Sequence, residues 1–147
     1  MATSFVKAAL SKVKADTTLA NQILYSPDDS YEPNLLVFIP KKECPFTCPF
    51  CASELAKTDH YSGENQAYRG RNIFDVEKNI LLLTVLYKCK LCGPLLGTDD
   101  DILRQSTNHT KFLLTHKSGW SARSIQQIIS QLSRGKKTLE YTRNHSI

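Results

Sequence analysis

The 147-residue chain has no apolar run long enough to cross a membrane. Its longest apolar stretch, residues 80–87, has the length of a β-strand. The first 22 residues contain three lysines and an aspartate, so no uninterrupted apolar segment is left for a secretory signal, and they lack the arginines of a transit peptide. These absences predict an intracellular protein, nuclear or cytoplasmic, without a membrane partner.

The sequence also lacks a recognisable catalytic motif. Its four histidines lie outside any metalloprotease spacing, and neither Ser62-Gly63 nor Ser118-Gly119 forms a nucleophile elbow. The run of aspartates at 99–101 is more typical of a helix N-terminus, where acidic side chains are stabilising, than of a carboxylate metal site. We therefore predict no enzymatic activity, no catalytic residue and no small-molecule substrate.

Acidic residues are the minority among the charged side chains. The chain has 19 basic and 14 acidic residues, a formal charge of +5 and an isoelectric point near 9.0. This is a mild bias toward polyanionic partners. Four thiolates and one Zn²⁺ would lower the formal charge to +3, so the charge is compatible with nucleic-acid binding and also with an ordinary soluble domain.

Hydrophobic spacing predicts three helical segments. Residues 4–24 carry apolar side chains at helical intervals. A second helix begins after Thr98, the expected N-cap, with Asp101 at the capping-box position. A third begins after Ser121 and ends at Gly135, and its stripe is expected to face the core. That stripe consists of Ile125, Ile128, Ile129 and Leu132.

Three other segments have the pattern of strands. Residues 35–40 form a short one, and residues 71–77 and 80–89 predict a hairpin. Residues 56–72 are polar and contain two glycines, which predicts a loop. The prediction is thus an α+β fold in three parts. They are a helical segment and linker at 1–34, a zinc-ribbon domain with C-terminal helices at 35–135, and a loose basic tail at 136–147.

Five cysteines provide the strongest chemical signal. Cys48 and Cys51 form one Cys-x-x-Cys pair, and Cys89 and Cys92 form another. The tight turn inside each pair points both sulfurs to one side, so two facing pairs give the tetrahedron that structural zinc prefers. We predict that these four cysteines bind Zn²⁺. The fifth, Cys44, is expected to be a free thiol.

Several alternatives stay open for this cluster. Cys44 or His60 could replace one of the four ligands, or the chain could bind no metal. A redox dithiol is disfavoured because neither pair opens a convincing helix after a strand. The spacer of 37 residues between the pairs is longer than the usual 15 to 20.

Residues 45–133 resemble an uncharacterised eukaryotic zinc-ribbon domain family, found in transposon-related and other multidomain proteins. The resemblance is carried by the two cysteine pairs, by an acidic helix start and by four short motifs: "SEL", "YRGRNIFD", "LYKCKLC" and "FLLTHKSGWS". It implies a β-hairpin zinc ribbon flanked by short helices, zinc binding, and association with proteins that handle nucleic acids. It implies no catalytic residue.

Basic and amide side chains supply the candidates for nucleic-acid contact. Arginines beside Tyr68 could stack on a base and hold a phosphate, lysines surround the cysteines, and the polar side of the last helix could read base edges. The candidates are Arg69, Arg71, Lys88, Lys90, Arg123, Gln127 and Arg134. The alternative is that they form ordinary solvated faces and ion pairs.

The sequence therefore predicts a zinc-binding module that contributes to DNA or RNA binding within a larger, transposon-related assembly. The alternative is a protein-interaction or scaffold domain in which zinc is purely structural.

Overall fold

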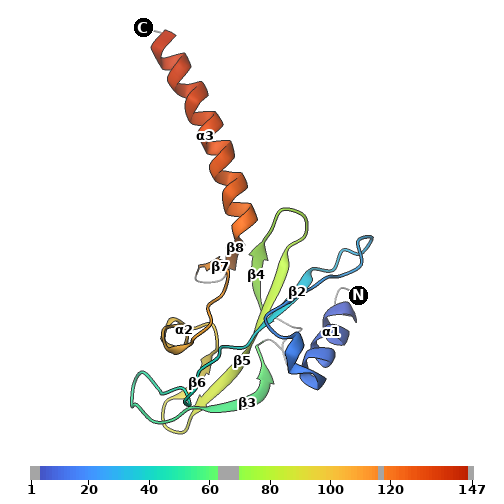
Figure 1. Ribbon diagram of the computed structural model, residues 1–147, viewed down its shortest axis with the longest axis vertical. Coiled ribbons are helices and arrows are strands. Elements are labelled where there is room, and N and C mark those ends of the chain that lie inside the picture. Colours follow the sequence, from blue (N-terminus) through green and yellow to red (C-terminus); the bar gives the residue numbers. More distant parts are fainter. Residues whose placement is uncertain (1–3, 63–69, 116–117, 146–147) are drawn as a thin grey trace.

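The computed structural model describes residues 4–62, 70–115 and 118–145, with side chains described as far as Arg134. In this part of the chain, an eight-stranded curled sheet is flanked by α1 and α2, and α3 projects away from it (Figure 1). The elements in chain order are α1 (Ser4–Ala15), the 3₁₀ helix η1 (Thr17–Leu19), β1 (Ile23–Leu24), β2 (Asn34–Phe38), β3 (Ala56–Tyr61), β4 (Arg71–Phe74), β5 (Ile80–Cys89), β6 (Gly93–Leu96), α2 (Asp100–Gln105), β7 (Phe112–Leu114), β8 (Ser118–Ser121) and α3 (Ala122–His145).

Strand β5 is the centre of the sheet and changes its neighbours halfway along. Its first half lies between β2, which runs parallel, and β4, which runs antiparallel. Its second half lies between β3 and β6, both antiparallel. At the point where the neighbouring strands change, the Thr84 hydroxyl donates to the Phe38 carbonyl at 2.7 Å. One strand therefore connects the two parts of the fold.

Alternating side chains on β2 divide the core between two faces. Leu35 and Val37 pack with the apolar side of α1, including Leu10 and Val13. The opposite face holds a second cluster of Leu36, Phe38, Ile73, Ile80 and Leu82, against which Ile23, Leu103, Phe112 and Leu114 pack. The sheet thus carries α1 on one face, and residues of β1, α2 and β7 on the other.

The N-terminal region differs from the predicted helix over residues 4–24, because α1 ends at Ala15. Asp16 caps the 3₁₀ turn that follows, accepting from the Thr18 amide at 3.1 Å and from its hydroxyl at 2.6 Å. Asn21 then takes a φ of 64°, in the left-handed region, and turns the chain into β1. Ile23 and Leu24 are strand residues, contrary to the prediction.

The middle of the chain confirms the predicted strands and adds β3 and β6. The hairpin of β4 and β5 and the strand β2 form as expected. Part of the predicted 56–72 loop is instead β3, in which only Tyr61 is buried. Exposure on both faces explains why its sequence shows no alternation. The segment 63–69 lies outside the described residues.

Helix α2 forms where predicted, but with a different cap. Asp99 occupies the N-cap position, and its carboxylate accepts from the Leu96 amide at 2.8 Å instead of from the helix. The segment after α2 forms the antiparallel hairpin of β7 and β8.

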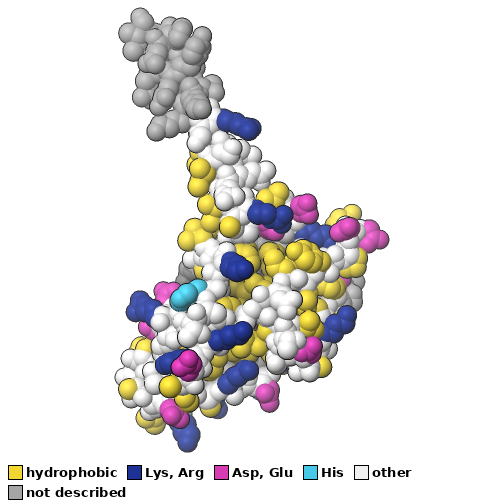
Figure 2. Space-filling view, viewed as in Figure 1, with side chains coloured by type: hydrophobic (Ala, Val, Ile, Leu, Met, Phe, Trp, Pro, Cys, Tyr) yellow, Lys and Arg dark blue, Asp and Glu magenta, His cyan; other side chains and the backbone are white. Residues whose placement is uncertain are grey.

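Helix α3 begins as predicted and ends later. The Ser121 hydroxyl accepts from the Ser124 amide at 3.1 Å, which is the expected N-cap bond. The helix continues past Gly135 to His145, contrary to the predicted stop and loose tail. The predicted core stripe is not covered, because Ile129 is 57% and Leu132 66% exposed. Figure 2 shows hydrophobic side chains along one side of this projecting helix.

Candidate metal centre and its surroundings

The four cysteines of the two Cys-x-x-Cys pairs come together at one end of the sheet. All their sulfur atoms lie within 4.8 Å of one another, and the Cys51 and Cys89 sulfurs are 3.4 Å apart. Cys48 and Cys89 are buried, Cys51 is half-buried and Cys92 is exposed. Four convergent sulfurs form the type of ligand set that a tetrahedral metal ion accepts.

The first pair lies in a compact turn closed by backbone hydrogen bonds. The Cys48 amide donates to the Ser53 carbonyl at 2.8 Å, and the Ala52 amide donates back to the Cys48 carbonyl at 2.9 Å. Ala52 has a φ of 60°, which a residue with a Cβ adopts at a cost. A bridge between Thr47 and Glu54 closes the base of the turn.

The second pair occupies the turn between β5 and β6. Cys89 is the last residue of β5 and pairs with Gly93, the first residue of β6. Gly93 has a φ of 98°. In both pairs, the residue directly after the second cysteine is therefore left-handed, which bends each chain around its sulfurs in the same way.

Hydrogen bonds within the cluster and with Ser53 shift the pKa values of Cys51 and Cys92 in opposite directions. Hydrogen bonds from the side chain and backbone of Ser53, with a further contribution from Cys89, lower the pKa of Cys51 to about 6. The hydrogen bond with Cys51, together with burial, raises the pKa of Cys92 to about 12. Ionising one sulfur opposes ionisation of the next, and a bound divalent cation would remove that opposition.

The alternative ligands stand outside the cluster. Cys44 is an exposed free thiol and His60 is an exposed residue of β3. Among the residues that the structure describes, the group that could hold a metal ion contains Cys48, Cys51, Cys89 and Cys92 alone.

Two of the predicted nucleic-acid residues have structural partners. The Arg71 guanidinium donates to the Thr115 carbonyl at 2.6 Å and so joins β4 to the loop after β7. Arg123 forms an ion pair of 2.8 Å with Asp75, whose side chain is only 4% exposed. Burial raises the pKa of Asp75, but the hydrogen bonds from Ser121 and Arg123 outweigh it, so the net pKa is lowered.

The other candidates divide between opposite ends of the molecule. Lys88 and Lys90 are exposed beside Cys89, at the end of β5. Gln127 and Arg134 are exposed on α3, which leaves the sheet at the other end (Figure 1). Arg69 lies outside the described residues. The predicted set therefore does not form one continuous surface in the described part of the chain.

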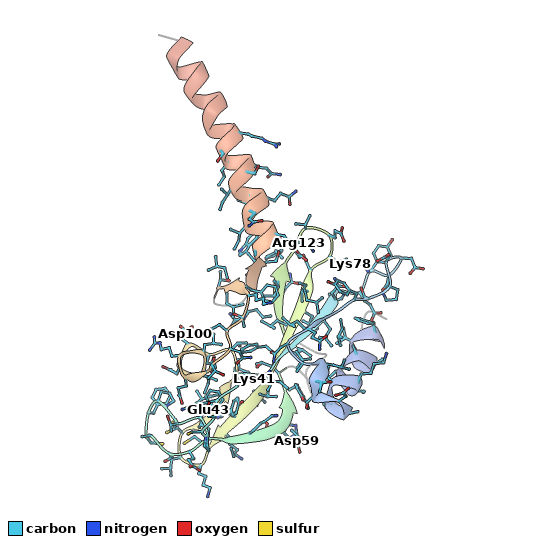
Figure 3. All side chains as sticks on the ribbon, viewed as in Figure 1. Lys41, Glu43, Asp59, Lys78, Asp100 and Arg123 are labelled. Atoms are coloured by element: carbon cyan, nitrogen blue, oxygen red, sulfur yellow. The ribbon has the colours of Figure 1, made fainter. Side chains whose placement is uncertain are left out.

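A hollow beside the metal centre holds lysines that the prediction set aside or missed. It has a volume of about 420 Å³, and its lining includes Lys41, Lys42 and Lys57, with Glu43 as the one acidic member. Lys42 lies 5.7 Å from the centre of the Phe46 ring and donates to Gln105 at 3.0 Å. Figure 3 shows Lys41 and Glu43 on the segment that leads from β2 to the first cysteine pair. The prediction of a loop over residues 56–72 does not place Lys57 on a strand, so the sequence does not single it out.

Comparison with known proteins returned no match to a protein-family model, to a curated protein or to a solved structure. No helix in residues 4–62, 70–115 and 118–145 combines the length and apolar character needed to cross a membrane.

Proposed function

We propose that Cys48, Cys51, Cys89 and Cys92 hold one structural Zn²⁺. The observation that carries this proposal is the approach of all four sulfurs to within 4.8 Å of one another. Four thiolates satisfy the tetrahedral preference of zinc and leave no open position for a substrate, so the ion would stabilise the fold and take no part in catalysis.

The surrounding strands support the zinc-ribbon interpretation. Strands β3 and β6 both run antiparallel to β5, and each cysteine pair lies in a turn at the same end of these three strands. Zinc bound there would join the turn before β3 to the turn between β5 and β6. Metal binding would then contribute directly to the free energy of folding.

Metal analysis of the purified chain tests the zinc site. We expect one zinc per chain, lost in Cys89→Ser and retained in Cys44→Ser, which is the matched control because Cys44 lies outside the cluster. Wild-type protein without zinc would contradict the proposal. Loss of zinc in Cys44→Ser would contradict the ligand set.

We further propose that the zinc-stabilised domain binds nucleic acid, as part of a larger, transposon-related assembly. The support is the exposed positive charge near the cysteines, from Lys41, Lys57, Lys88 and Lys90. Together with Lys42 they carry +5, which exceeds the summed −4 of a zinc tetrathiolate and the neighbouring Glu43 and Glu54, and this charge would attract phosphates. Electrophoretic shifts on DNA and RNA test this binding, which should weaken between about 50 and 200 mM salt. An affinity that does not change with salt concentration would count against phosphate contacts.

The uncovered stripe of α3 favours a second candidate function, the pairing of two copies of this chain. Ile125, Ile128, Ile129 and Leu132 follow the spacing of a helix–helix seam, and the flanking Gln126 and Gln131 are uncharged. Gln127 lies on the opposite side of the helix from this stripe. Two such faces could meet without like charges opposing each other along this stretch. Light scattering should then report a dimer that Ile129→Lys dissociates and the control Gln127→Lys leaves intact. A monomeric wild type would contradict this candidate.

A further inference from the structure

A second hollow, which we call the sheet groove, lies on the face of the sheet opposite α1. It has a volume of about 430 Å³, within the range of small-ligand sites. Its floor consists of Leu36 and Phe38 of β2, with Ile23 of β1 beside them. Ile23 pairs with Leu36, so alternation along the two strands points all three toward this face. Tyr25 follows on the same side of the chain.

The two walls of the groove are fixed to the end of β2. On one side, Asn21 accepts from the Ile39 amide at 3.0 Å and donates to the Ile39 carbonyl at 3.2 Å. On the other side, Asn108 accepts from the Lys41 amide at 2.6 Å and donates to the same Ile39 carbonyl at 3.2 Å. These bonds hold both walls at a set distance from the floor. They also engage one donor and one acceptor of each asparagine amide.

The groove combines aromatic surface with positive charge. Tyr25 is 72% exposed at one edge, and Phe112 is half-buried at the other. Lys41, Lys111 and the ionisable His109 are exposed around it. No acidic side chain lines the groove in the described part of the chain. Figure 2 shows hydrophobic side chains gathered over the middle of the sheet, with lysine and arginine side chains around them.

This composition matches a ligand with a flat apolar part and a negative charge beside it. A nucleobase with its phosphate has this chemistry, because bases stack on aromatic rings whatever their identity and phosphates pair with lysines. A double helix does not fit the arrangement, since its bases are stacked on one another and their faces cannot enter a groove. We propose that the sheet groove binds one base of a single-stranded nucleic acid, with the adjacent phosphates held by Lys41 and Lys111.

The position of Lys41 indicates the direction in which a bound nucleic-acid strand would leave the groove. It lines both the sheet groove and the hollow beside the metal centre, where Lys42 and Lys57 add further positive charge. A single strand with one base in the groove could therefore extend its backbone past Lys41 toward the cysteine end. The zinc site and the groove would then belong to one binding surface. This inference rests on the proposed nucleic-acid binding and deepens it.

Fluorescence anisotropy with the full zinc-loaded chain and a labelled oligothymidylate of about 12 nucleotides tests the site. We expect Tyr25→Ala to lower the affinity roughly tenfold, because one stacking contact is lost. Tyr31→Ala is the matched control, since Tyr31 is also an exposed tyrosine but lies outside the groove. The double variant Lys41→Gln, Lys111→Gln should reduce the slope of log affinity against log salt by about 1.4, or about 0.7 per phosphate. The control Lys7→Gln, Lys12→Gln on α1 should leave the slope unchanged.

Three competitors complete the test. Inorganic polyphosphate, a duplex of the same length and a free mononucleotide should each compete poorly, because each lacks either the exposed base or the flanking phosphates. Equal competition by polyphosphate or duplex would overturn base insertion, and equal competition by the mononucleotide would overturn the need for a strand. If wild type binds the oligonucleotide but the groove variants behave like their controls, the groove assignment fails while nucleic-acid binding stands. If wild type binds no oligonucleotide, both fail.

Discussion

The side-chain amides of Asn21 and Asn108 donate hydrogen bonds to one and the same acceptor, the carbonyl oxygen of Ile39, each at 3.2 Å. The two residues are far apart in the sequence, yet each pairs with the backbone just after β2, where the strand ladder has ended. Their side chains thus continue the pairing of β2 on both sides. The sheet groove owes its shape to these two asparagines.

Replacing one of them should loosen a wall of the groove. Asn108→Ala removes the bonds to the Lys41 amide and to the Ile39 carbonyl. Two such bonds, partly exposed to solvent, correspond to a loss of about 1–2 kcal/mol in the free energy of unfolding. Urea denaturation measures the loss, with Gln127→Ala on α3 as a neutral control. An unchanged unfolding midpoint for Asn108→Ala would show that water replaces these bonds at no cost.

Ala52 and Gly93, the residues with a left-handed backbone after the cysteine pairs, should give opposite changes in stability when alanine is replaced by glycine and glycine by alanine. Ala52→Gly should stabilise the zinc-loaded protein by up to about 1 kcal/mol, because glycine adopts its φ of 60° without strain. Gly93→Ala should destabilise by about 1 kcal/mol, although a Cβ at Gly93 would meet no atom within 4 Å. Thermal unfolding of the two variants measures whether each substitution raises or lowers the stability. Two shifts in the same direction would contradict the common geometry of the turns.

The buried carboxylate of Asp75 should make the free energy of unfolding depend on pH in the acidic range. Its pKa is held below the usual value of 3.8 in the folded state, so the folded protein binds fewer protons there than the unfolded chain. The contribution is therefore present above about pH 4 and is lost as the pH falls below that value. Asp75→Asn should lower the free energy of unfolding by about 1–2 kcal/mol at pH 7 through weaker bonds to Ser121 and Arg123. Wild type and variant should converge as the pH falls through the lowered pKa of Asp75, and a difference in the free energy of unfolding that does not shrink with falling pH would contradict this role.

Removal of the proposed zinc should unfold both parts of the sheet together. Strand β5 contributes its second half to the metal centre and its first half to the clusters on both faces of β2. Loss of order at Cys89 should therefore spread along one continuous strand. Chelation followed by circular dichroism and Trp120 fluorescence should give superimposable transitions. Loss of one signal while the other persists would show that the two halves of β5 fold independently.

The sequence predicted those features that depend on local pattern. The continuous apolar run of β5 predicted a strand covered on both faces, and the spacing of Cys48, Cys51, Cys89 and Cys92 predicted the cluster. Both patterns can be recognised in the sequence without knowing which segments pack against them. The boundaries at 34/35 and 135/136 and the identity of the metal stay predictions.

What the sequence left out depends on contacts between distant segments. Strand β3 pairs with β5 through its backbone while most of its side chains stay in water. Its sequence therefore lacks the alternation of apolar and polar residues that would predict a strand. The isoleucines of α3 have the spacing of a core stripe, and only the tertiary structure shows that the core does not reach Ile128 and Ile129. The sheet groove likewise arises where β1 and residues 108–112 meet on β2.

The parallel pairing of β2 with β5 bears on how fast the chain can fold. Partners such as Phe38 and Thr84 are 46 positions apart, so this ladder must close a long segment before any of its bonds form. The first cysteine pair lies within that segment, and the second lies a few residues beyond its end. A metal ion captured by the pairs in a still mobile chain would shorten the remaining search and lower its entropic barrier. Refolding should then be faster in the presence of the ion than in its absence, even where the final stabilities are matched with denaturant.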